Sequence, residues 1–206
     1  MPSEIFVPRS IPLFREGLEY IDFHVFGDAS KQGVSAVLYA VVHQHSGTSQ
    51  GFLASKSRLS KKGYTIPRLE LIACHMAANL LSNARNALKH LPIRKCQAWS
   101  DSTVALYWIL SGKEYKPVVN KQVRKIKSKE NIEWNYVNTK DNPADLGSRG
   151  CHGDELLKSF HSGPEWLTKP ECWPEKIEIK ATEESEKEAM STKKNDRRSY
   201  GHGGGK

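Results

Sequence analysis

The order of strand-like and helix-like segments is the feature that most restricts how this chain can fold. Three early segments are rich in β-branched and aromatic residues, and they cover residues 20–26, 34–43 and 52–59. Such segments, with turn residues over 45–51 between the last two, predict a meander of three antiparallel strands. From Pro67 the apolar residues recur at helical spacing, which predicts one long helix that ends before Leu91.

The second half of the chain alternates between the two kinds of segment. We expect a strand over 96–101, helices over 103–110 and 118–127, a strand over 132–137 and a last short helix opened by Asn142-Pro143. The resulting order is βββ-α-β-α-α-β-α. A meander followed by βα alternation predicts an α/β domain with a five-stranded mixed sheet and helices on both faces.

Composition divides the chain into four parts. We expect an N-terminal connecting segment over 1–19, the α/β domain over 20–150, a tryptophan-containing extension that packs on it over 151–175, and a disordered polar tail over 176–206. The tail is predicted to be disordered because its many charged residues and scarce aromatics cannot bury enough surface to order it.

The positive charge is concentrated in the middle of the chain. The formal net charge is +8, and residues 51–129 hold 16 basic residues against three acidic ones. Such a surface suits a phosphate backbone, whose binding releases condensed counterions, although a solvated helix face would have the same composition. The candidate nucleic-acid-binding residues are Lys113, Lys116, Lys121, Arg124, Lys125 and Lys127.

Nothing in the sequence predicts a membrane span or a secretory signal, because no run of about 18 apolar residues occurs. The cysteines form no Cys-x-x-Cys pair, which favours a reducing compartment, so we expect an intracellular protein of the cytoplasm or nucleus without a membrane partner. A zinc site remains an alternative, although its ligands would have an unfamiliar spacing. Those ligands would be Cys151, His152, His161 and Cys172.

Four acidic residues, Asp28, Glu70, Asp101 and Asp145, fall at the edges of the predicted elements. If the first and fourth strands are neighbours, Asp28 and Asp101 emerge side by side at their carboxyl ends. Clustered carboxylates repel unless cations lie among them, so the four predict a divalent metal site. Each acid could instead be a turn or cap residue. An aspartic-protease pair is a weaker alternative, because neither Asp-x-Ser/Thr triplet is followed by glycine.

Several motifs together resemble a known family. They are HVFGDAS, SKSRL followed by TIPRLELIA, WSDSTVALYWI, NTKDNPADLGSRG, GPEWL and CWP. In combination they are similar to the ribonuclease H-like region of BEL/Pao-type LTR retrotransposon polyproteins, over roughly residues 5–175. The resemblance implies a ribonuclease H-like fold, placed in such polyproteins between reverse transcriptase and integrase. The chain would then be a fragment, a degenerate copy or a domesticated piece of such an element.

The resemblance also implies a role for each acid. The acids of the DAS, PRLEL, DS and NPAD motifs fall on Asp28, Glu70, Asp101 and Asp145, with Asp141 as the competing candidate for the fourth position. As metal ligands they would hold two Mg²⁺ ions, or Mn²⁺ in their place, and hydrolyse the RNA strand of an RNA/DNA hybrid. The alternative is a catalytically inactive or domesticated module that only binds nucleic acid.

Overall fold

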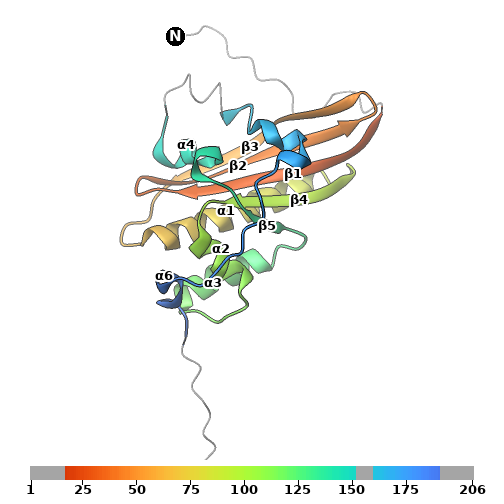
Figure 1. The fold of residues 1–206 in the computed structure, drawn as a ribbon. Coiled ribbons are helices and arrows are strands. Elements are labelled where there is room, and N and C mark those ends of the chain that lie inside the picture. The colour runs from red at the N-terminus through yellow and green to blue at the C-terminus, as the bar shows by residue number, and fades with distance from the viewer. Residues whose placement is uncertain (1–16, 152–159, 191–206) are drawn as a thin grey trace, which may run out of the picture.

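A five-stranded mixed sheet forms the centre of the molecule (Figure 1). The structure is a computed structural model that describes residues 17–151 and 160–190. The strands are arranged in the order β3-β2-β1-β4-β5. Their bounds are β1 Leu18–Ala29, β2 Gly33–Gln44, β3 Gly47–Leu59, β4 Ile93–Ser100 and β5 Glu133–Tyr136. The first three strands pair antiparallel, whereas β4 and β5 join the sheet in parallel. The predicted fold class is therefore confirmed.

The hairpin between β2 and β3 is tighter than the sequence indicated. Turn residues were expected over 45–51, but β3 already begins at Gly47, which pairs with Gln44. Only His45 and Ser46 remain in the loop. Main-chain pairing overrides the weak strand propensity of the Gly, Ser and Thr residues, and Gly47 has a φ of +135°, which glycine adopts without a steric penalty.

One face of the sheet is covered by three helices, α1 Ile66–Ala87, α2 Thr103–Leu110 and α3 Pro117–Lys127. The alternation along β1 explains the packing, because Ile21, Phe23 and Val25 all point into the core that α1 completes. Because α1 begins at Ile66, one residue before Pro67, Glu70 lies in the second turn of the helix.

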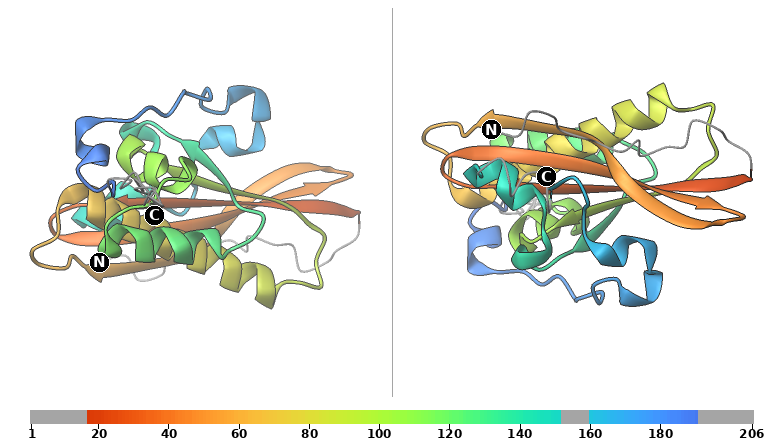
Figure 2. Two further views of the ribbon diagram at one scale, coloured as in Figure 1. Left: turned by 90° about the horizontal axis from the view of Figure 1, so that it is seen from below. Right: turned by 90° about the horizontal axis from the view of Figure 1, so that it is seen from above.

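The opposite face is covered by α4 Ala144–Arg149 and by short 3-10 turns after it (Figure 2). Phe26 and Trp99 point to this side and pack against Phe160 and Leu167, so residues 160–173 complete a second apolar core. The turns after α4 are η3 Glu165–Thr168 and η4 Pro170–Cys172, and a further 3-10 turn, η1 Thr139–Asp141, precedes α4.

The chain after Lys176 differs from the disordered tail that composition predicted. Residues 176–190 are placed on the domain and include a short helix, α6 Glu183–Glu186. Polar contacts with other elements hold this segment, such as the hydrogen bond from Trp108 Nε1 to the Ser185 carbonyl at 3.0 Å, and Ala189 also packs against the core beneath α2 and α3. Residues 191–206 of the predicted tail and 1–16 of the predicted N-terminal segment lie outside the described residues.

Within residues 17–151 and 160–190, none of the helices combines the length and the apolar character needed to cross a membrane.

Candidate active site

Two of the four predicted catalytic acids lie at the ends of neighbouring strands. Gly27 of β1 is paired with Ser100 of β4 in parallel register. The next residues, Asp28 and Asp101, therefore leave the two strands at the same edge of the sheet, as predicted from their positions. Asp28 is only 6% exposed, whereas Asp101 is half-buried.

Glu70 reaches this edge because α1 lies very close to β1. A Cβ atom on Gly27 would lie 3.1 Å from the backbone carbonyl of Ala73, so a larger residue would require α1 to move away by a few tenths of an ångström. Glu70 is located one helical turn before Ala73. Its Oε2 accepts a hydrogen bond from Ser102 Oγ at 2.5 Å, which links the helix to the residue that follows Asp101.

Asp145 is brought in by α4, which packs on the other face of β1 and β2. A Cβ atom on Gly147 would come within 2.2 Å of Ser35 Oγ, so glycine is needed for this contact. In the same helix, Ser148 Oγ donates a hydrogen bond to Asp28 Oδ2. Arg149 Nε donates to Asp145 Oδ1 at 2.6 Å, an ion pair one turn apart on the helix.

The capping alternatives do not fit the helix ends. Ser102, and not Asp101, caps α2 by accepting a hydrogen bond from the Ala105 amide at 3.1 Å. The N-terminus of α4 has no side-chain cap, so Asp145 does not act as one. The four acids are thus held by contacts other than helix capping, and we name Asp28, Glu70, Asp101 and Asp145 the carboxylate edge.

The charges of the carboxylate edge act on one another. Burial raises the pKa of Asp28 to about 6, and the charges of Asp101 and Asp145 add to this against the opposing hydrogen bond from Ser148. Burial likewise raises the pKa of Glu70 to about 7, with further contributions from Asp101 and Asp28 and an opposing hydrogen bond from Ser102. Asp145, rather than Asp141, contributes to the pKa of Asp28. This favours Asp145 as the fourth member.

The chemistry of the carboxylate edge fits a hard divalent cation. All four donors are carboxylates, which Mg²⁺ prefers, and a cation would offset the burial and the mutual repulsion that raise the pKa of Asp28 and Glu70. In the described part of the chain, however, no three His, Cys, Asp or Glu side chains are arranged to hold one metal ion. Each carboxylate is instead hydrogen-bonded to a hydroxyl, amide or guanidinium group of the protein. The same finding covers Cys151, His161 and Cys172 of the alternative zinc set, whereas His152 lies outside the described residues.

The sequence did not reveal the residues that position the acids. Asn142 Nδ2 donates to Asp101 Oδ1 at 3.3 Å and to the Gly27 carbonyl at 3.2 Å, so one buried amide joins three elements. Ser102 and Ser148 hold Glu70 and Asp28 in the same way. All three lie inside the quoted SDST and NPADLGSRG motifs, and a polar residue within a motif is the signal that could have identified them.

The predicted nucleic-acid-binding residues are all exposed, and α3 presents four of them beside α1. Val119, Val123 and Ile126 are buried under α3, which leaves its cations on the outer face. We name Lys121, Arg124, Lys125 and Lys127 the α3 cations. Arg124 Nη2 lies 3.9 Å from Glu114 Oε1. The three lysines among the α3 cations form no ion pair with any acid of the described residues. Lys113 and Lys116 are held differently, by residues 186 and 187 near the C-terminal end of the described chain.

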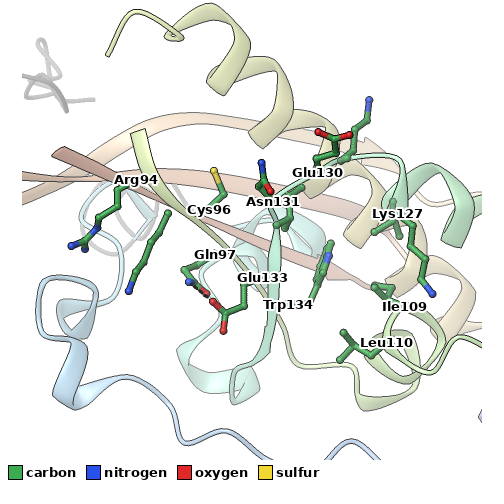
Figure 3. Close-up of a pocket in the computed structure, with 14 residues that line it drawn as sticks. Arg94, Cys96, Gln97, Ile109, Leu110, Lys127, Glu130, Asn131, Glu133 and Trp134 are labelled. Atoms are coloured by element: carbon green, nitrogen blue, oxygen red, sulfur yellow. Dashed lines mark hydrogen bonds between the residues drawn. The ribbon is translucent and has the colours of Figure 1, made fainter. Parts of the chain in front are cut away.

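A separate groove of about 660 Å³ runs along the open edge of β4 beneath α2 and α3 (Figure 3). Its walls include Arg94, Gln97, Leu110, Glu133 and Trp134, and none of the carboxylate edge. Because the groove contains none of the carboxylate edge, the candidate site is the surface around the carboxylates and not this groove.

One family model matches the first half of the chain. Residues 1–102 match the family described as Pao retrotransposon-like RNaseH-like domain. That range includes Asp28, Glu70 and Asp101 and ends before Asp145. A search of curated proteins finds no match.

Several solved structures are similar to this chain. A crystal structure of LC11-RNase H1 from compost, in complex with RNA/DNA hybrid, is 16% identical with a TM-score of 0.44, and the alignment covers 66% of this chain and 99% of that one. RNase H1 from Halobacterium salinarum NRC-1 is 14% identical with a TM-score of 0.40, over 63% and 94% of the two chains. The N-terminal RNase H domain of a Mycobacterium tuberculosis protein is 17% identical with a TM-score of 0.39, over 63% and 91%.

Proposed function

Because residues 1–102 match the family described as Pao retrotransposon-like RNaseH-like domain, we propose that the chain is a metal-dependent endonuclease that hydrolyses the RNA strand of RNA/DNA hybrids. The observation that carries the proposal is the meeting of four acids from four separate elements at one edge of the sheet. Acids gathered at a cost in repulsion indicate a cation-dependent role more strongly than a structural one.

In this proposal the carboxylate edge holds two Mg²⁺ ions, with Mn²⁺ as the alternative. Asp28 would be the ligand common to both, because its charge interacts with those of Asp101 and Asp145. When bound, the ions would activate a water and stabilise the leaving oxygen of the RNA strand. Ser148, Ser102 and Asn142 would keep the carboxylates oriented, while Arg149 would have to share Asp145 or release it.

The α3 cations would bind the phosphate backbone of the hybrid beside the carboxylate edge. We further propose that the chain works with the reverse transcriptase and integrase regions of a retrotransposon polyprotein, of which it is part or from which it derives. An intracellular location, cytoplasmic or nuclear, belongs to the same proposal and is supported by free cysteines, two of them buried.

A second candidate is a nucleic-acid-binding module that has lost cleavage. The ion pair between Arg149 and Asp145 favours it, because a paired carboxylate is less available to a metal. The endonuclease and the binding module predict different results in one cleavage assay.

The decisive assay incubates the purified chain with an RNA/DNA hybrid labelled on the RNA strand, with Mg²⁺ or with chelator. We expect Mg²⁺-dependent cleavage that is lost in Asp101→Asn and retained in Asp141→Asn, a neighbouring acid outside the carboxylate edge. Binding without cleavage at high protein concentration would instead support the binding module. Equal cleavage by Asp101→Asn and the parent would refute the assignment of the carboxylate edge.

A further inference from the structure

The acidic strap, which we define as residues 182–190, lies on α2 and on the connection between α2 and α3. It contains four glutamates and one lysine. Figure 1 and Figure 2 both place α6, the helical part of the strap, close to the beginning of α1. The strap therefore runs beside the end of the molecule that carries Glu70.

Main-chain contacts hold the acidic strap in place. The Ser185 carbonyl accepts a hydrogen bond from Trp108 Nε1 at 3.0 Å, and Ala189 forms a β-bridge with Tyr115. The Lys116 amide donates to the Glu188 carbonyl at 2.8 Å. None of these three contacts involves a glutamate carboxylate.

Two of the strap's carboxylates are engaged by cations of the domain. Glu186 Oε1 accepts hydrogen bonds from Lys113 Nζ at 2.8 Å and from Tyr107 OH at 3.3 Å. Glu188 Oε1 accepts from Arg68 Nη2 at 2.6 Å and from Arg68 Nε at 3.0 Å. Lys113 is one of the predicted nucleic-acid-binding residues.

The ion pair between Arg68 and Glu188 leaves one carboxylate oxygen of Glu188 buried without a partner in the described part of the chain, which an ion pair that served only to stabilise the fold would not require. The Glu188 side chain is only 12% exposed, and its Oε2 atom is buried without a hydrogen-bond partner among the described residues. A buried carboxylate oxygen left unpaired loses its hydration without compensation. Arg68, two residues before Glu70 on α1, thus holds an anion beside the carboxylate edge that the fold does not fully satisfy.

Two further interactions connect the acidic strap to the predicted binding residues and to the carboxylate edge. Lys116 Nζ donates to the Lys187 carbonyl at 2.6 Å, so a second predicted nucleic-acid-binding lysine is covered by the strap. The negative charge of Glu184 also acts on Glu70, which places the strap within electrostatic reach of the carboxylate edge.

We propose that the acidic strap is an internal competitor of the nucleic acid, in which Glu186 and Glu188 hold Lys113 and Arg68 until phosphates of the hybrid replace them. Arg68 thereby becomes an additional phosphate-binding residue next to the carboxylate edge. The inference rests on the proposed function, because it assumes that the hybrid lies across this edge.

The test compares two double variants of the full chain that remove the same charge. One is Glu186→Gln with Glu188→Gln, and the control is Glu171→Gln with Glu175→Gln, two exposed acids outside the strap. Binding of a labelled RNA/DNA hybrid is measured with chelator at several salt concentrations, after melting curves have shown that each variant folds.

We expect the strap variant to bind at least about threefold more tightly than the control variant at low salt. Its slope of log K against log salt should be steeper by roughly 1.8, since each additional phosphate contact contributes roughly 0.9. Adding Arg68→Gln and Lys113→Gln to the strap variant should remove both gains, because the released cations are then absent.

Equal affinity and slope in the two double variants would overturn the inference, as would a gain that survives loss of Arg68 and Lys113. Failure of every form to bind the hybrid would overturn it as well. The proposed function is judged separately, by Mg²⁺-dependent cleavage in the parent chain.

Discussion

Replacing Asp28 with Asn should stabilise the protein in the absence of metal. Asn keeps the shape of the side chain and can still accept the Ser148 hydrogen bond through its carbonyl oxygen, but it carries no charge. The pKa of Asp28 is raised from its ordinary value of 3.8 to about 6, so the folded state disfavours the ionised form. At 1.36 kcal/mol per pH unit of difference, this corresponds to about 2 to 3 kcal/mol.

The pH dependence determines whether Asp28→Asn is more or less stable than the parent. Well below pH 3.8 the carboxyl is protonated in both the folded and the unfolded state, so its ionisation has no effect on the free energy of unfolding. As the pH rises from about 4 to above 6, the unfolded state loses its proton first, and the parent loses stability relative to the variant. The gain of Asp28→Asn should therefore be absent near pH 3.5 and complete at pH 7.5.

A matched control lies in the same strand. Asp22 is 3% exposed and accepts hydrogen bonds from Arg94 Nε at 3.0 Å and from the Lys95 amide at 3.1 Å. Asp22→Asn removes the same charge from a site where that charge is paired, so it should lower the free energy of unfolding by about 2 kcal/mol. The two substitutions should shift stability in opposite directions.

Thermal melting with chelator, at pH 3.5 and at pH 7.5, measures both effects. For a chain of this length, a gain of 2 to 3 kcal/mol corresponds to an increase of roughly 4 to 12 °C in Tm. Added Mg²⁺ should raise the Tm of the parent more than that of Asp28→Asn, because the ion binds the ionised carboxylates of the folded state. A variant less stable than the parent at pH 7.5, or a gain equal at both pH values, would refute the argument that the folded state disfavours the charge of Asp28.

Three further predictions concern binding, packing and the strap. Changing the four α3 cations to Gln should weaken hybrid binding for every sequence and lower the salt slope by roughly 0.9 for each lost phosphate contact, and an unchanged slope in binding titrations would exclude this face. Gly147→Ala should cost about 1 to 3 kcal/mol in a denaturation experiment and reduce cleavage, because its Cβ would lie 2.2 Å from Ser35 Oγ and displace α4. Trp108→Phe removes the 3.0 Å hydrogen bond to the Ser185 carbonyl, so limited proteolysis should cut residues 182–190 faster than in the parent, with a loss of about 1 kcal/mol.

The sequence predicted those parts of the site that depend on regular periodicity. Strand alternation and the parallel pairing of β1 with β4 were enough to place Asp28 and Asp101 side by side. The contribution of Gly27 was not predictable, because it lies in how closely α1 approaches the strand, which involves Ala73, 46 residues further along the chain. Asn142 was missed for the same reason, since its amide joins elements that only the folded chain brings together.

The acidic strap was missed for a different physical reason. Composition measures how much apolar surface a segment can bury, and by that measure residues 176–190 appear disordered. Their order depends on main-chain pairing with Tyr115 and Lys116 and on ion pairs with Arg68 and Lys113, none of which has a periodic signature. Charge complementarity between distant segments becomes visible only when both partners are placed.

The charges of the carboxylate edge, the acidic strap and the α3 cations favour two steps in the proposed reaction, initial binding of the hybrid and then seating of its scissile phosphate. The carboxylate edge and Glu184 repel the phosphates of a hybrid, whereas the α3 cations attract them whether or not metal is present. Initial binding would therefore rest on α3 and depend on salt, and seating of the scissile phosphate at the carboxylate edge would depend on a divalent cation. In this proposal the strap acts between these steps, because it holds Arg68, two residues before Glu70 on α1, and Lys113, in the connection that leads to α3. Release of Glu186 and Glu188 would then be driven by phosphates already bound nearby, which makes the strap a barrier to weak or short ligands rather than to a long hybrid.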